Sequence, residues 1–449
     1  MFATPPTTLH LISDMKFGAT FTFLLSLISI ALAVSFIVPG AVWTDTSGAK
    51  ILAHGGHVMQ VDNTFYWLGY GSAAGVVPNI YESTDLMNWE HVGFATDQVT
   101  GMYRPKFIYS GGKWYIWGQV NREIVTLVAP GSTLASTEYT LTGSPALLPP
   151  DSRSFSDMGV FVDDGGDAYF LSSADSNNLQ INNIDGGSPI TIGTRVADLE
   201  AAVEAPGMLK SDGVYFLVVS QKTGWAANPD KVYWATSIDG PWQGGTDIAP
   251  ESTNTYGSQN SAELMIVGSS TTTYIFLGDI WDSTGSDASN YEWLPISVST
   301  SSNTLTLQDY AMWTVNPSSG VIAFANFANT TFNAADGIVR GSAVIKKRAV
   351  HNIDSSSNVT FTNVIGKGDK QWVAFKYTVS NVTAGEAHVS VNGDAPINLS
   401  DLNSRAGYRS TIPVALALKE GANTLTFGTT ATGGDFEAHL EGIEVFDDY

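Results

Sequence analysis

Residues 106–120 read KFIYSGGKWYIWGQV, two apolar runs joined by a Ser-Gly-Gly turn, with aromatic residues concentrated in the second run. Short glycine-containing turns between such runs are typical of β-hairpins. The pattern recurs as HVMQVDNTFYWLGYG at 57–71, VFVDDGGDAYFLSSA at 160–174, GMLKSDGVYFLVVSQ at 207–221 and ELMIVGSSTTTYIFLGD at 263–279. The five stretches indicate one repeated structural unit.

The length of the repeat indicates which unit it is. The aligned tyrosines are separated by 49, 54, 46 and 59 residues; they are Tyr66, Tyr115, Tyr169, Tyr215 and Tyr274. A spacing of about 50 residues, with further short strands between the hairpins, matches one four-stranded propeller blade. The sequence therefore predicts a five-bladed β-propeller over residues 42–322. A long β-sandwich with similar hairpins is the alternative.

Composition favours an all-β chain and excludes several functions. Charged residues make up only 14% of the chain, well below the usual value of about 25%, and no long stretch after residue 50 has the period of an amphipathic helix. The formal net charge of −22 argues against nucleic acid as a partner, because phosphate binding needs basic patches. The absence of cysteine excludes thiol catalysis and disulfides.

The pattern changes after residue 320. Strand-like runs such as QWVAFKYTVS, AHVSVNG and NTLTFGTT predict a separate β-sandwich over residues 323–449. This region holds four N-glycosylation sequons, at Asn329, Asn358, Asn381 and Asn398. Such sequons mark exposed loops of secreted glycoproteins.

The N-terminus predicts an export signal within residues 1–41. Lys16 precedes an apolar run from Phe17 to Val38, which contains a small-residue exit at Ala31-Leu32-Ala33. The run is also long enough to span a bilayer. We expect a cleaved signal rather than an anchor, hence a secreted, extracellular protein with no stable membrane association.

Polar residues recur just before or on the first strand of each repeat. They lie in AHGG (53–56), MYRPK (102–106), SFSDMG (154–159), VEAPG (203–207) and TYGSQNS (255–261), and comprise His54, Arg104, Asp157, Glu204 and Gln259. Because propellers place functional groups on the inner strands around the channel mouth, we expect these five side chains to converge there. A carboxylate pair in such a polar pit suits glycoside hydrolysis.

Each candidate also has a structural interpretation. Glu204 stands in an apolar run, where burial would raise its pKa as a general acid requires, but it could equally be paired or solvated at a strand end. Asp157 could cap a turn. His54 and Gln259 could serve only as hydrogen-bonding residues.

The order of the motifs adds a resemblance to a known family. AHGG, STDLMNW, RPK, SDM…FVDDGGDAY, EAPGML, KTGW, TYGSQ, GDIWD and YEWLP follow one another over roughly residues 50–320. This series resembles glycoside hydrolase family 43, and within it the fungal exo-β-1,3-galactanase branch. Residues 325–449, with VNG and EGANTLTFG, resemble a family 35 carbohydrate-binding module.

The resemblance implies roles for these residues. Glu204 would be the general acid, and Asp157 would raise its pKa. AHGG lacks the aspartate that is the usual family base, and Gln259 would replace it by orienting the water or through its imidic tautomer. Inversion of the anomeric centre is implied.

Contacts to the sugar are expected from His54, Tyr103, Arg104 and Trp225, the last by stacking. Tyr103 stands where the branch usually has glutamate. Asp163, Asp164 and Asp167 resemble a calcium loop, but a hairpin turn is the preferred interpretation. We expect no metal in the site and no cofactor; calcium in the C-terminal domain is left open.

The leading hypothesis is a secreted, monomeric enzyme acting on β-1,3-galactan or arabinogalactan side chains of plant or fungal cell walls. Two alternatives remain. One is a non-catalytic glycan-binding protein with a degenerate site, because the sugar-contact positions are altered. The other is a family 43 enzyme acting on arabinose or xylose polymers.

Overall fold

The computed structural model describes residues 36–71, 75–142, 155–175, 177–187, 190–282, 284–324, 330–379, 387–399, 409–429 and 438–447. Most of the predicted signal region, with Asn329 and Asn381, lies outside these ranges. Strands dominate the described residues, and helix is limited to a single turn, α1 (Asn254–Gly257), and two 3-10 turns. No helix in the described part of the chain is long and apolar enough to cross a membrane.

Five four-stranded antiparallel sheets follow one another along the chain. The first sheet comprises β1 (His54–Val61), β2 (Thr64–Gly71), β3 (Val77–Ser83) and β4 (Glu90–Phe94), and the second comprises β5 (Tyr103–Ser110), β6 (Lys113–Val120), β7 (Glu123–Val128) and β8 (Thr140–Leu141). The third comprises β9 (Phe155–Val162), β10 (Ala168–Ala174), β11 (Asn178–Asp185) and β12 (Thr191–Leu199), and the fourth comprises β13 (Val203–Ser211), β14 (Val214–Gln221), β15 (Lys231–Ala235) and β16 (Gln243–Asp247). The fifth comprises β17 (Gln259–Val267), β18 (Thr272–Ile280), β19 (Asn290–Ser299) and β20 (Thr304–Leu307).

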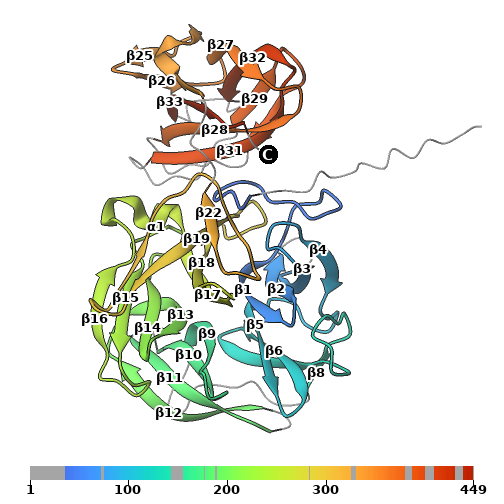
Figure 1. Ribbon diagram of the computed structural model, residues 1–449, viewed down its shortest axis with the longest axis vertical. Coiled ribbons are helices and arrows are strands. Elements are labelled where there is room, and N and C mark those ends of the chain that lie inside the picture. The colour runs from blue at the N-terminus through green and yellow to red at the C-terminus, as the bar shows by residue number, and fades with distance from the viewer. Residues whose placement is uncertain are drawn as a thin grey trace, which may run out of the picture.

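The five sheets are the blades of a propeller. Their first strands, β1, β5, β9, β13 and β17, contact one another in a closed ring. Figure 1 looks onto this ring, with β4, β8, β12 and β16 at its periphery. The five-bladed propeller predicted from the tyrosine spacing is confirmed, and the single long sandwich is excluded.

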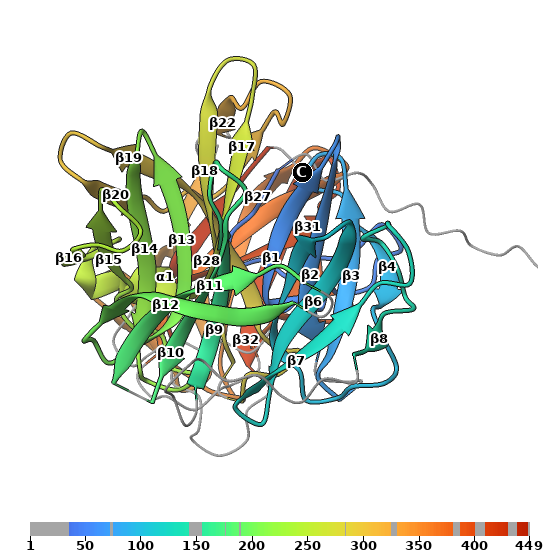
Figure 2. The same cartoon turned by 90° about the horizontal axis from the view of Figure 1, so that it is seen from below.

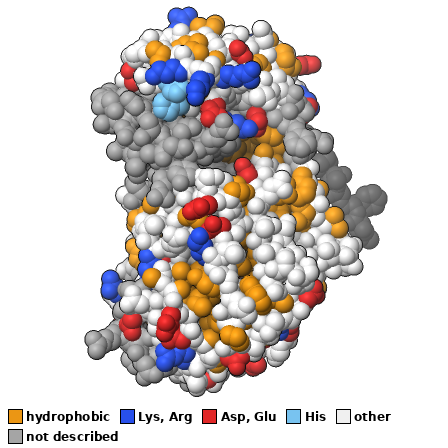
Figure 3. Space-filling model, turned by 90° about the vertical axis from the view of Figure 1, so that its left-hand side faces the viewer, with side chains coloured by type: hydrophobic (Ala, Val, Ile, Leu, Met, Phe, Trp, Pro, Cys, Tyr) orange, Lys and Arg blue, Asp and Glu red, His pale blue; other side chains and the backbone are white. Residues whose placement is uncertain are grey.

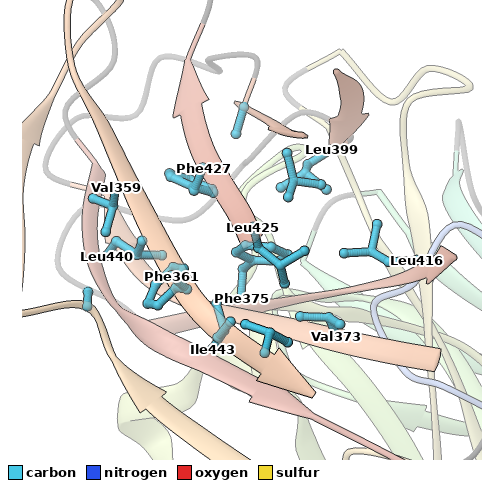
Figure 4. Close-up of a cluster of buried hydrophobic side chains, with 14 of the residues drawn as sticks. Val359, Phe361, Val373, Phe375, Leu399, Leu416, Leu425, Phe427, Leu440 and Ile443 are labelled. Atoms are coloured by element: carbon cyan, nitrogen blue, oxygen red, sulfur yellow. The ribbon is translucent and has the colours of Figure 1, made fainter. Parts of the chain in front are cut away.

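The C-terminal region forms two sheets that enclose an apolar core. One sheet has the order β25 (Val344–Lys346), β26 (Ala349–Ile353), β33 (Ala438–Val445), β28 (Lys370–Val379) and β31 (Arg409–Ala417), with β23 (Thr330–Asn333) also on β33; the other has the order β24 (Ile338–Arg340), β27 (Asn358–Gly366), β32 (Gly421–Thr429), β29 (Ala387–Val391) and β30 (Ile397–Leu399). Phe361, Phe375 and Phe427 lie in the core between them (Figure 4). Seen from below, this sandwich lies behind the propeller (Figure 2).

The described N-terminal segment packs into the fold. Ile37 exchanges two backbone hydrogen bonds with Trp313, of 2.7 and 3.0 Å, on the short strand β21 (Trp313–Val315), which pairs with β22 (Ile322–Phe324). Val38 and Ala41 are buried in an apolar cluster with Trp372 of the sandwich. Residues 36–41 therefore pack against the folded body, although they fall within the predicted signal region, 1–41.

Candidate active site

A β-bulge interrupts the first strand of every blade near the channel mouth. The pairing register shifts between His54 and His57 on β1, Tyr103 and Lys106 on β5, Ser156 and Met158 on β9, Glu204 and Gly207 on β13, and Asn260 and Ala262 on β17. Arg104, Asp157 and Ala205 in these bulges have φ of 47°, 52° and 54°, which is unfavourable for residues other than glycine. Bulges re-aim side chains, and here they turn them into one pocket.

The pocket collects most of the predicted site residues. It is lined by Tyr70, Tyr103, Arg104, Gln119, Asp157, Glu204, Gly224, Trp225, Gln259 and Trp281. Six of the seven predicted residues are among them. Tyr70, Gln119, Gly224 and Trp281 were not predicted.

His54 is the exception, and its predicted contact with sugar is wrong. Its side chain is fully buried, with Nδ1 at 3.0 Å from Oδ1 of Asp279 and its ring stacked on Tyr291 at 4.7 Å. The other carboxylate oxygen of Asp279 accepts the backbone N–H of Gly55 at 2.9 Å. His54 and the backbone of the β1 bulge are therefore bonded to the same carboxylate, that of Asp279. The His54 side chain does not line the pocket.

Arg104 connects the carboxylate and amide groups of the site. Its Nε lies 2.9 Å from Oδ1 of Asp157, its Nη2 donates to Oε1 of Gln259 at 2.7 Å, and its Nη1 donates to the carbonyl of Asn260 at 3.2 Å. All three guanidinium nitrogens are therefore engaged by the protein. The predicted contact of Arg104 with the sugar would therefore be made in addition to these three protein contacts.

Gln259 is held by four hydrogen bonds. Its Nε2 donates to Oε1 of Glu204 at 3.2 Å and to Oγ of Ser220 at 2.8 Å. Its Oε1 accepts from Arg104 and, at 2.9 Å, from Nε1 of Trp281. Arginine and tryptophan only donate, so these two contacts identify the amide oxygen and fix which way the amide points.

Inverting glycosidases usually separate their two catalytic carboxyl groups by about 6.5–9.5 Å, and Glu204 and Gln259 lie much closer together than that. The two side chains are in direct hydrogen-bond contact, because β13 and β17 are neighbours in the ring and Ser220 anchors the amide beside its cross-strand partner Glu204.

Burial, and after it the negative charge of Asp157, raise the pKa of Glu204 to about 7 against the opposing effects of Arg104, Lys222 and the Gln259 amide. Asp157 is fixed beside it, because its Oδ2 accepts the backbone N–H of Ala205 at 3.1 Å. A carboxyl group with this pKa retains its proton near neutrality, which is what a general acid needs.

Aromatic rings form one wall of the pocket. Tyr70 stacks on Trp281 at 6.2 Å with 15° between the planes, and Trp225 meets the Trp281 ring edge-on at 5.0 Å. Tyr103 packs against Tyr70 at 5.1 Å and, like Trp225, is exposed at the rim. Such amphipathic rings suit the apolar face of a sugar.

The aspartates of VDDGGDAY form a hairpin turn, the interpretation preferred over a calcium loop. The backbone N–H of Asp163 bonds the Asp167 carbonyl at 2.9 Å, and its carboxylate binds Lys210 and Tyr215, both at 2.6 Å. Among the residues that the structure describes, no group of acidic or histidine side chains is arranged to hold a metal ion.

Comparisons with known proteins identify the class. The family model of Glycosyl hydrolases family 43 matches residues 53–277. The crystal structure of an exo-β-1,3-galactanase from Phanerochaete chrysosporium with galactose is 31% identical, with a TM-score of 0.80, and the match covers 92% of this chain and 100% of that chain. The chain belongs to glycosyl hydrolases family 43 and is a glycosidase.

Two further structures resemble the chain less closely. A family 43 β-1,3-galactosidase with galactodeoxynojirimycin is 25% identical, with a TM-score of 0.54, over 61% of this chain and 99% of that one. A putative exo-β-1,3-galactanase from Bifidobacterium bifidum is 24% identical, with a TM-score of 0.55, over 61% and 96%; at that identity it supports the fold alone. No curated protein matches the chain in a sequence comparison.

Proposed function

We propose that this glycosidase is an inverting exo-β-1,3-galactanase that removes galactose from β-1,3-galactan or arabinogalactan side chains. The observation that carries the proposal is the convergence of Glu204, Asp157 and Gln259 in one aromatic-walled pocket. The similar exo-β-1,3-galactanase from Phanerochaete chrysosporium, whose crystal structure contains galactose, supports the choice of sugar.

In this proposal, Glu204 protonates the oxygen of the leaving sugar. Its raised pKa supplies the proton at neutral pH. Asp157 maintains that pKa by its charge and is held in place by its ion pair with Arg104. Among the described residues, the pocket lining holds no carboxylate besides Glu204 and Asp157, and we propose Gln259 in place of the base.

Gln259 orients the attacking water as an amide. Its oxygen already accepts from two groups that only donate, Arg104 and Trp281. The imidic tautomer would place a hydrogen on that oxygen, facing both N–H groups. The geometry therefore disfavours removal of the water's proton by an imidic Gln259. To orient the water, the amide N–H would have to exchange its hydrogen bond to Glu204 for one to the water.

Secretion is part of the proposal. Cleavage after Ala33 in the predicted signal would leave Ile37, which pairs with Trp313, in the mature chain. We also propose that the protein is a monomer and that it acts on plant or fungal cell-wall polysaccharide. The sandwich would serve as its carbohydrate-binding module.

The test is incubation of the purified protein with β-1,3-galactan, arabinogalactan, arabinan and xylan, followed by identification of the sugar released and of its first anomer by NMR. Galactose released from β-1,3-galactan as the α-anomer is expected. Release of arabinose or xylose alone would replace the proposed substrate, and binding without turnover would indicate a glycan-binding protein.

The Glu204→Gln variant is expected to lose activity on polysaccharide but to retain part of it on aryl glycosides, whose leaving group needs no proton.

A further inference from the structure

One corner of the sandwich gathers cations in a strongly acidic chain. Arg340 at the end of β24 and Lys346, Lys347 and Arg348 at the end of β25 are all exposed, and we call these four residues the basic corner. Residues 337–353 contain no aspartate or glutamate. Figure 3 shows Lys and Arg side chains gathered beside a histidine on this part of the molecule.

The members of the basic corner have no acidic partner among the residues that the structure describes. Elsewhere in the described part of the chain, salt bridges engage Arg104, Arg195, Lys210, Lys231, Lys367 and Lys376. No ion pair among the same residues includes a member of the basic corner. With 43 acidic and 21 basic residues in the chain, four neighbouring cations without partners are available for an external anion.

Backbone and neighbours give the corner a definite shape. β24 and β25 are the edge strands of the two facing sheets, and the turn after β25 holds Lys347 at a φ of 58°, a conformation that favours glycine or asparagine. Ile338 and Ile345 are exposed by 50% and 52% beside the cations. The surface is therefore cationic and apolar together.

We propose that the basic corner binds the carboxylates of a uronate-bearing polysaccharide. The formal charge is −22, and it would be −26 without these four residues. A densely charged partner such as nucleic acid or an anionic bilayer would bring many charges within a Debye length of about 8 Å of this acidic chain. A polysaccharide with carboxylates at intervals brings few, and its sugar rings can cover Ile338 and Ile345.

The experiment compares an arabinogalactan that carries glucuronate with the same polymer after reduction of its carboxyl groups. Wild-type protein is expected to bind the native polymer, with affinity falling as salt rises, and to bind the reduced polymer less tightly. The Lys346→Gln/Arg348→Gln variant is expected to raise the dissociation constant about fivefold, since exposed ion pairs contribute about 0.2–1 kcal/mol each.

The Lys113→Gln/Arg122→Gln variant is the matched control, because it removes the same charge from exposed hairpin turns of the propeller. An equal loss in this control would overturn the site, as would equal binding of the reduced polymer. Tighter binding to phosphatidylserine vesicles or duplex DNA would overturn the ligand class. No binding at all would mean that the cations only protect two sheet edges from pairing with other chains. Hydrolysis of neutral β-1,3-galactan is expected to be unchanged in both variants, so this result stands apart from the proposed catalytic function.

Discussion

At the residue scale, the charge of Asp157 controls the pH range over which Glu204 holds its proton. The acid must be protonated to act, so activity falls as pH rises through its pKa of about 7. Asp157→Asn removes a negative neighbour and leaves Arg104 without its ion pair. Both changes lower the pKa of Glu204, so the alkaline limb of kcat/KM is expected to move to lower pH.

Asp212→Asn is the control for this shift. Asp212 is an exposed acid in the β13–β14 turn, with a φ of 46° that asparagine tolerates. Its pH profile is expected to match that of wild type. An alkaline limb that does not move in Asp157→Asn would show that another group sets it.

The amide of Gln259 is the second prediction at this scale. Gln259→Ala is expected to reduce kcat by about 10²-fold or more, the scale of a lost positioning or acid–base group, while substrate affinity changes much less. Trp281→Phe removes one of the two donors to the amide oxygen and is expected to lower kcat by about fivefold, since one hydrogen bond contributes about 1 kcal/mol.

Steady-state kinetics and substrate binding separate these effects. If Gln259→Ala retains the wild-type rate, another residue activates the water, and Asp157 would be the first to examine. If Trp281→Phe alters only KM, the ring serves the sugar and not the amide.

At the element scale, the antiparallel hairpin explains what sequence could and could not predict about the site. The repeated motifs mark the start of each first strand, which identified Arg104, Glu204 and Gln259. The end of each second strand lies opposite that start, so Gln119 pairs with Tyr103 and Ser220 pairs with Glu204. These partners were missed because no motif marks them, although the hairpin register would have identified them.

Close approach between blades at the bulges gives a prediction about one glycine. A Cβ on Gly159 of β9 would lie 2.2 Å from the carbonyl oxygen of Pro206, two residues after Glu204 on β13. Gly159→Ala must therefore push β9 and β13 apart. We expect a loss of about 1–3 kcal/mol in the free energy of unfolding, as for other overpacked sites, together with reduced activity.

Gly165→Ala in the turn after β9 provides the comparison. A Cβ there would meet nothing closer than 3.9 Å, so denaturant unfolding and activity are expected to be nearly unchanged. Equal effects of the two substitutions would mean that the spacing of β9 and β13 is not what limits either property.

At the scale of the whole molecule, the repeat was predictable but its N-terminal boundary was not. Aligned tyrosines recur because each blade packs the same hairpin against its neighbours, so the spacing survives in the sequence. An apolar segment has the same composition whether it is a signal or a buried strand, and Ile37 and Val38 were therefore assigned to the signal region. Only their contacts with Trp313 and Trp372 distinguish the two.

The segment after them connects the first blade to the last, and Trp43 tests that connection. Its ring lies 6.0 Å from Trp67 of the first blade and 5.0 Å from Trp293 of the last, and its Nε1 donates to the carbonyl of Val38 at 2.8 Å. Trp43→Ala removes these contacts together. We expect a loss of about 3 kcal/mol in the free energy of unfolding, as for other large aromatic truncations, measured by denaturant titration.

Trp225→Ala removes the same side chain from the pocket rim, where Trp225 is 37% exposed, and is expected to weaken substrate binding with little change in stability. The reverse outcome, a stable Trp43→Ala protein and an unstable Trp225→Ala protein, would show that the ring of blades is closed by β1 and β17 alone.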